Sequence, residues 1–146
     1  NKVTLIPRKK KKKMMMWIMS QFHIGVFPTR AEGWCLPALE CMAMGTNLLI
    51  SNVTAMRDFC NNDNSILVDL PNKELAYDDV FFKNNIGNWH DISQDEIEQF
   101  KNALWDSYKL WKKGDFKENE RGRETAEKYS WNNTVQILMK EVGVNV

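Results

Sequence analysis

Short apolar runs alternate with amphipathic stretches through the first half of the chain. Four of these runs have the length of buried strands, and they are residues 3–6, 23–27, 47–51 and 65–68. Apolar residues three and four positions apart predict helices over 9–20 and 36–44, and a shorter helix is expected over 55–60. Strands that alternate with helices form parallel sheets covered on both faces. The pattern therefore predicts an α/β fold with a Rossmann-like parallel sheet and flanking helices.

The second half of the chain predicts a helical end. Residues 69–91 lack a clear period and are expected to form a long functional loop. Ser93 and Glu96 have the spacing of a capping box, and Gly114 suits the end of the helix that follows. The apolar stripe expected to be buried on this helix is Ile97, Phe100, Leu104, Tyr108 and Trp111.

Two further helices are expected after Gly114. A polar helix is predicted over about residues 116–129, and Ser130 is expected to cap a last helix. The buried face expected on that last helix is Val135, Leu138, Met139 and Val142. The tryptophans at helical spacings, Trp105, Trp111 and Trp131, are expected in the core rather than on a carbohydrate-binding surface.

Composition favours a cytoplasmic protein. The chain has 146 residues and three cysteines, without a Cys-x-x-Cys pair or a secretory signal, which fits a reducing compartment. No apolar segment approaches the roughly 20 residues of a membrane-spanning helix. The chain begins at Asn1, not at Met, and we expect it to be a piece of a longer protein.

Basic residues are concentrated at the start of the chain. Residues 1–30 hold eight of the 20 Lys and Arg residues and no acidic residue. The run Lys9 to Lys13, followed by Met14 to Met16, is most simply a solvated helix face; peripheral contact with an anionic membrane is the sharper alternative. We expect no nucleic-acid binding, because no base-stacking platform accompanies the charge.

The strongest chemical signal is a pair of glutamates eight positions apart. Glu32 and Glu40 lie in a run that leaves the strand at Phe27, crosses a turn at Gly33 and enters a helix near Pro37. Free backbone N–H groups at a helix start bind anions. Such donors between two carboxylates suit a ligand with both phosphate and hydroxyl groups, such as a nucleotide-sugar.

The string over residues 27–45, Phe-Pro-Thr-Arg-Ala-Glu-Gly-Trp-Cys-Leu-Pro-Ala-Leu-Glu-Cys-Met-Ala-Met-Gly, resembles a retaining glycosyltransferase of family 4 (group 1) with the GT-B fold. The residues around Asp58 and Phe59 and the run Ser-Trp-Asn-Asn-Thr at 130–134 resemble later parts of the same family. The resemblance identifies residues 1–146 as the C-terminal, donor-binding domain, with the N-terminal acceptor domain outside this chain. Because the family's phosphate-binding Arg and Lys also lie upstream, this piece alone is expected to bind a donor weakly and to transfer poorly or not at all.

The resemblance implies transfer of a hexose from a nucleoside diphosphate sugar to a saccharide, lipid or protein acceptor, in glycan biosynthesis. Glu32 would face the donor sugar, and Glu40 would accept hydrogen bonds from the ribose. The turn that holds the diphosphate would be Gly33, Trp34, Cys35 and Leu36. A second turn, at the end of the adjacent strand, would add Asn52, Val53 and Thr54. Neither a cofactor nor a metal is expected, and Asp78-Asp79 is not an Asp-x-Asp metal signature.

Other readings of these residues stay open at this point. Glu32 and Glu40 could merely cap a helix and favour its dipole. Cys35 could be a nucleophile at the helix start, although no histidine nearby completes a dyad. The competing class of function is a non-catalytic α/β module that binds a nucleotide or a protein. A third class, a basic membrane- or nucleic-acid-binding domain, rests on residues 8–18 alone.

Overall fold

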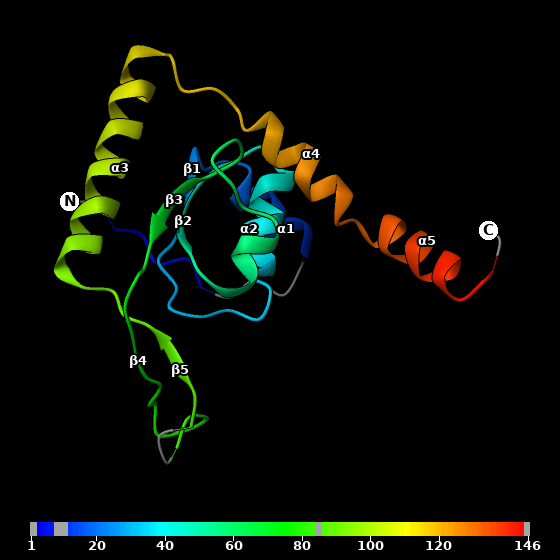
Figure 1. Cartoon of the computed structure of the whole chain (residues 1–146). Helices are drawn as coiled ribbons and strands as arrows, with labels where there is room; N and C mark the ends of the chain where they lie inside the picture. Colours follow the sequence, from blue (N-terminus) through cyan, green and yellow to red (C-terminus); the bar gives the residue numbers. More distant parts are fainter. Residues whose placement is uncertain (1–2, 8–11, 84–85, 145–146) are drawn as a thin grey trace.

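The computed structural model describes residues 3–7, 12–83 and 86–144 and contains helices on both sides of a parallel sheet (Figure 1). The elements in chain order are α1 (Lys12–Met19), β1 (Ile24–Phe27), α2 (Leu36–Ala43), β2 (Asn47–Asn52), the 3-10 helix η1 (Thr54–Asp58), β3 (Ile66–Asp69), β4 (Lys73–Leu75), β5 (Asn88–His90), α3 (Gln94–Lys113), α4 (Glu120–Lys128) and α5 (Trp131–Glu141).

The sheet has the order β1-β2-β3, and both pairings are parallel. Gly25 pairs with Leu48, and Leu49 pairs with Ile66, so β2 is the central strand. The strand–helix alternation correctly predicted this α/β arrangement, because parallel neighbours require a crossover connection between them.

The central strand separates two apolar clusters. Leu48 and Ile50 pack with α2 in one cluster, whereas Leu49 packs with Phe100 of α3 in the other. Successive side chains of a strand point to opposite faces, so an apolar run without alternation is buried on both sides. Figure 1 shows α2 and α3 on opposite sides of the strands.

Local signals set the ends of the helices. The Ser93 hydroxyl accepts from the Asp95 N–H, and the Glu96 carboxylate accepts from the Ser93 N–H, which confirms the capping box. Gly45 and Gly114 follow helices with φ of 76° and 78°. An L side chain is strained in that region, so glycine is the residue expected there.

A buried asparagine attaches α4 to the sheet domain. The Asn119 amide group donates to the backbone oxygens of Thr46 and Asn64, and its oxygen accepts from the Gly122 N–H at 2.8 Å. All three bonds satisfy a polar side chain that is almost fully buried. The start of α4 is thereby fixed next to the loop that follows α2.

Two predictions concern the first 30 residues. The strand predicted over residues 3–6 is wrong, and the start of the helix predicted over 9–20 lies outside the described residues. Residues 3–7 form no strand, and Val3 and Leu5 are 87% and 90% exposed. A strand needs a paired neighbour, and none of the described strands lies beside this segment. The helix predicted from residue 9 begins at Lys12 among the described residues. Residues 8–11 lie outside them, and with them most of the lysine run.

The prediction of an irregular loop over 69–91 is wrong in part. Lys73–Leu75 and Asn88–His90 pair as the antiparallel strands β4 and β5, which project from the body of the domain (Figure 1). Their short runs contain no apolar alternation. The pairing is therefore decided by contacts made elsewhere in the fold.

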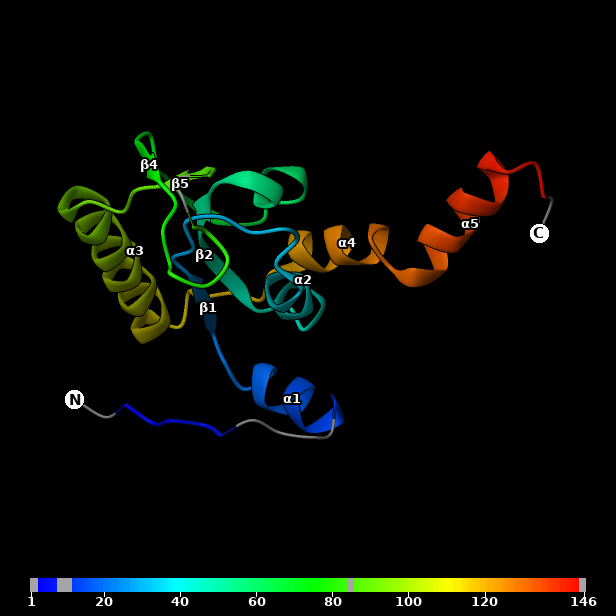
Figure 2. The ribbon, with the colours of Figure 1, turned by 90° about the horizontal axis from the view of Figure 1, so that it is seen from below.

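The prediction of continuous buried faces on α3 and α5 is also wrong. Phe100 is buried, but the other four residues of the α3 stripe are partly exposed, because α3 packs mainly against β2 and β3. No residue of α5 is buried, and this helix lies away from the sheet (Figures 1 and 2). Trp105, Trp111 and Trp131 are accordingly surface residues, with Trp131 82% exposed.

Within the described ranges, the helices are all too short or too polar to cross a lipid bilayer.

Candidate functional site

The two predicted turns meet at the carboxyl edge of the sheet. β1 ends at Phe27 and β2 at Asn52, and the turns that follow are joined by the Glu32 N–H, which donates to the Thr54 hydroxyl at 2.9 Å. Ligands of open parallel sheets bind beyond this edge. The structure thus brings Glu32 next to Thr54, although the two residues are 22 positions apart.

The start of α2 leaves backbone donors unused. Cys35 is the N-cap residue, in the left-handed conformation with φ of 55°, and its side chain makes no capping bond. Among the described residues, the backbone N–H groups of residues 33–36 have no hydrogen-bond partner. Adjacent N–H groups at a helix start, close to a left-handed residue, are a favourable arrangement for an anion.

The two predicted carboxylates lie on either side of these donors in the chain, and neither has a partner among the described residues. Glu32 and Glu40 are partly buried, and neither side chain forms an ion pair or a hydrogen bond with the described part of the chain. Neither carboxylate caps α2, so the geometry does not support the interpretation of Glu32 and Glu40 as capping residues. Partly buried carboxylates without partners are free to accept hydrogen bonds from a ligand.

The three predicted residues of the second turn, Asn52, Val53 and Thr54, have different surroundings. The Asn52 amide donates to the Asp69 carboxylate at 2.6 Å, and the Val53 side chain is fully buried against Leu49 and Phe100. Of these three residues, Thr54 is the one whose side chain forms a hydrogen bond with the Glu32 turn among the described residues. Any ligand contact of Val53 would have to use its backbone.

Trp34 and Leu36 differ in their surroundings. The Trp34 ring packs against Phe59 and Tyr129, with centroids 5.7 and 5.3 Å away. This packing gives the indole a structural task, and its contact with a donor stays a prediction. Leu36 is the exposed first residue of α2.

The three cysteines are buried and free. Burial raises the pKa of Cys41 and of Cys60 to about 11, with the Glu40 charge adding to the effect at Cys41. Burial also raises the pKa of Cys35, opposed by the Ala38 N–H and reinforced by the Glu32 charge. A nucleophilic cysteine needs a lowered pKa. The raised pKa of the buried Cys35 thiol therefore disfavours catalysis by this residue.

Because burial raises the pKa values of Cys41 and Cys60, we expect the domain to lose stability in alkaline solution. The folded chain keeps the protons of Cys41 and Cys60 up to about pH 11, against an ordinary pKa of 9.0. A group whose pKa is raised in the folded state contributes its full stabilisation below the pKa that it has in the unfolded state. This contribution is lost as the pH rises through the pKa of the folded state. Urea unfolding between about pH 8 and about pH 11 should therefore give a falling free energy of unfolding. A Cys41→Ala/Cys60→Ala variant should show a shallower fall, and equal slopes for both proteins would contradict the prediction.

Two arginines at this edge had no role in the sequence-based prediction. Arg57 donates twice to the backbone oxygen of Asn52, at 3.1 and 3.0 Å. Arg30 lies two positions before Glu32 and contacts the β4–β5 hairpin. The only signal in the sequence was a basic residue within each turn, which does not reveal the partner.

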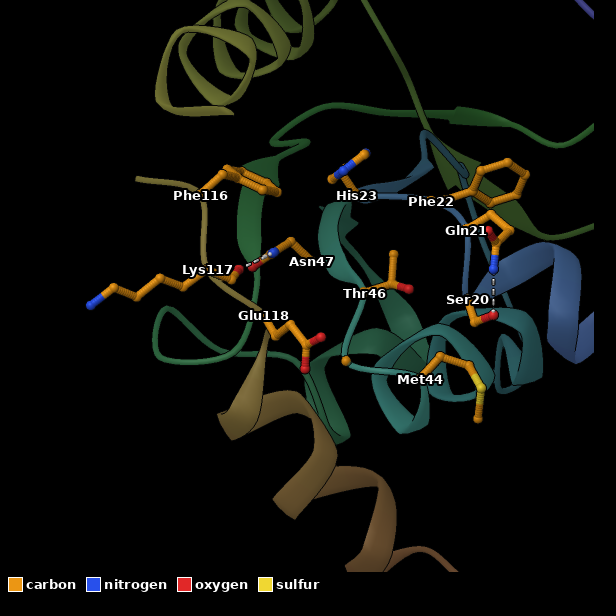
Figure 3. A pocket seen from close by; sticks show the side chains of 11 residues that line it. Ser20, Gln21, Phe22, His23, Met44, Thr46, Asn47, Phe116, Lys117 and Glu118 are labelled. Atoms are coloured by element: carbon orange, nitrogen blue, oxygen red, sulfur yellow. Dashed lines mark hydrogen bonds between the residues drawn. The ribbon is translucent and has the colours of Figure 1, made fainter. Parts of the chain in front are cut away.

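A cavity of about 190 Å³ lies at the opposite edge of the sheet. Figure 3 shows it between the start of the strands and the segment before α4, with His23, Asn47 and Glu118 among its lining residues. It is separate from the Glu32 turn. Among the described residues, no three His, Cys, Asp or Glu side chains lie close enough together to hold a metal ion.

No model of a known protein family matches this chain, and no curated protein matches it at a significant level. The resemblance of residues 27–45 to a glycosyltransferase family therefore stays a prediction.

Proposed function

We propose that this chain is the donor-binding half of a metal-independent, retaining glycosyltransferase, which moves a hexose from a nucleoside diphosphate sugar to a saccharide, lipid or protein acceptor. The observation that carries the proposal is the turn over residues 32–36, whose free N–H groups lie between Glu32 and Glu40, neither of which has a partner among the described residues. The same string supplied the family resemblance, so sequence and geometry support one site.

Each part of the turn has a task in the proposed reaction. The N–H groups of residues 33–36 would bind the diphosphate and stabilise the charge that develops as it leaves. Glu40 would accept hydrogen bonds from two ribose hydroxyls. Glu32 would orient the sugar and stabilise positive charge on its reacting carbon. Thr54 would hold the Glu32 backbone through the hydrogen bond described above.

The test is a calorimetric titration of the purified chain with UDP, GDP and ADP, repeated on Glu40→Ala. We expect one nucleotide to bind best and the variant to weaken it about tenfold or more, because a hydrogen bond to a charged acceptor contributes about 1.5–3 kcal/mol. Glu98→Ala, which removes an exposed carboxylate paired with Lys101 on α3, is the matched control and should bind like the parent chain.

Two outcomes would contradict the proposal. If a folded chain bound none of the three nucleotides, residues 1–146 would not form a donor site by themselves. If one nucleotide bound with equal affinity to the parent and to Glu40→Ala, the chain would bind nucleotides in another way, as a non-catalytic module could.

A further inference from the structure

The turn that carries Glu32 is joined to a hairpin distant in the sequence. The Arg30 Nε donates to the backbone oxygen of His90 at 2.7 Å, and the His90 N–H donates back to the Arg30 oxygen at 3.0 Å. The Arg30 guanidinium also forms an ion pair with Glu74. One side chain thereby contacts both β4, through Glu74, and β5, through His90.

An aromatic ring completes the enclosure of this guanidinium. The Arg30 guanidinium carbon lies 4.3 Å from the centre of the Trp89 ring, and the indole N–H donates to Glu74 at 3.1 Å. The hydrogen bonds from Arg30 and then from Trp89 lower the pKa of Glu74. Trp89 in turn contacts Phe82 edge-to-face, with ring centroids 5.7 Å apart. A continuous set of contacts therefore runs from the hairpin loop to the residue two positions before Glu32.

We propose that Arg30 is a positioning residue, which locks the turn that carries Glu32 to the β4–β5 hairpin and so fixes the place of that carboxylate. The planar guanidinium suits this task, because it can donate to a carbonyl and a carboxylate while its face lies on a ring. A lysine has a point-like ammonium group without a planar fork or a stacking face, so it cannot combine these contacts in the same geometry. The role of Glu32 in the reaction rests on the proposed function, whereas the attachment of its turn to the β4–β5 hairpin by Arg30 does not.

The first measurement is the exchange rate of the Glu32 amide hydrogen by NMR, because this N–H donates to Thr54 across the site. We expect Arg30→Ala to raise the rate about tenfold or more, since hydrogen bonds from a charged donor are lost. Arg30→Lys should give a smaller increase. Arg121→Ala, which breaks an ion pair with Glu124 on α4, is the matched control and should leave the rate unchanged.

Glu74→Gln weakens the same attachment from the side of the hairpin and leaves Arg30 in place. This variant therefore tests the proposal even if Arg30→Ala does not fold. A faster Glu32 amide in this variant, with an unchanged urea midpoint, would separate positioning from a general loss of stability. Unchanged exchange at Glu32 in both Arg30→Lys and Glu74→Gln would overturn the proposal.

Nucleotide titration of the same variants distinguishes the two proposals. If UDP, GDP or ADP binds the parent chain, Arg30→Ala should weaken that binding, because the N–H groups of residues 33–36 that would hold the diphosphate belong to the turn that Arg30 locks. Arg121→Ala should leave the affinity unchanged; equal affinities in all three proteins would overturn the positioning role. If none of them binds the parent chain, the proposed function fails, and the amide exchange rate alone decides whether Arg30 holds the turn.

Discussion

Under the proposed function, replacing Glu32 with glutamine is expected to lower the turnover number of a transferase that joins this domain to an acceptor domain by about 100- to 1000-fold. Glutamine keeps the size of the side chain and an oxygen acceptor but removes the negative charge. The lost charge matters most when positive charge develops on the sugar carbon. Donor affinity should therefore change far less than turnover, because the ground state carries no such charge.

The measurement is a comparison of kcat and of donor Kd for the parent enzyme and the Glu32→Gln variant. Glu141→Gln is the control, since this carboxylate lies on exposed α5, away from the turn. A fall in donor affinity as large as the fall in kcat would mean that Glu32 acts in uniform binding. That result would remove Glu32 from the proposed chemistry and leave it as a binding residue.

Replacing Ile50 with alanine is expected to lower the free energy of unfolding by about 3 kcal/mol. Ile50 is fully buried in the central strand and packs in the cluster beneath α2. Truncation removes apolar surface from the core and leaves a cavity that the surrounding strands can fill only in part. Urea unfolding followed by circular dichroism would measure the change.

Ile66→Ala is the matched control for this experiment. Ile66 lies at the start of β3 and is 39% exposed, so the same chemical change should cost about half as much, roughly 1.5 kcal/mol. Similar losses for both variants would mean that the cluster beneath α2 contributes no more to the stability of the domain than the partly exposed start of β3. That result would also weaken the assignment of β2 as the central strand.

The candidate site was predictable where its residues are neighbours in the chain. Glu32, Gly33 and Glu40 fall in one strand–turn–helix string, and such a string places its N–H groups and carboxylates together by local geometry alone. The link from Glu32 to Thr54 followed from the parallel sheet, because carboxyl ends of adjacent strands meet at one edge. The Arg30–Glu74 pair had no such signal, since 44 positions separate the two residues.

The sequence by itself determined the three strands of the sheet and their alternation with helices, the capping box at Ser93 and the helix end at Gly114. These features depend on hydrophobic period, side-chain caps and permitted φ values, all of which act over a few residues. Only the tertiary structure decided the β4–β5 pairing, the attachment of Arg30 to it and the exposure of α5. The physical reason is that a strand pair, an ion pair and the cover of a helix face each depend on which distant segment lies opposite, and a local pattern does not specify that segment.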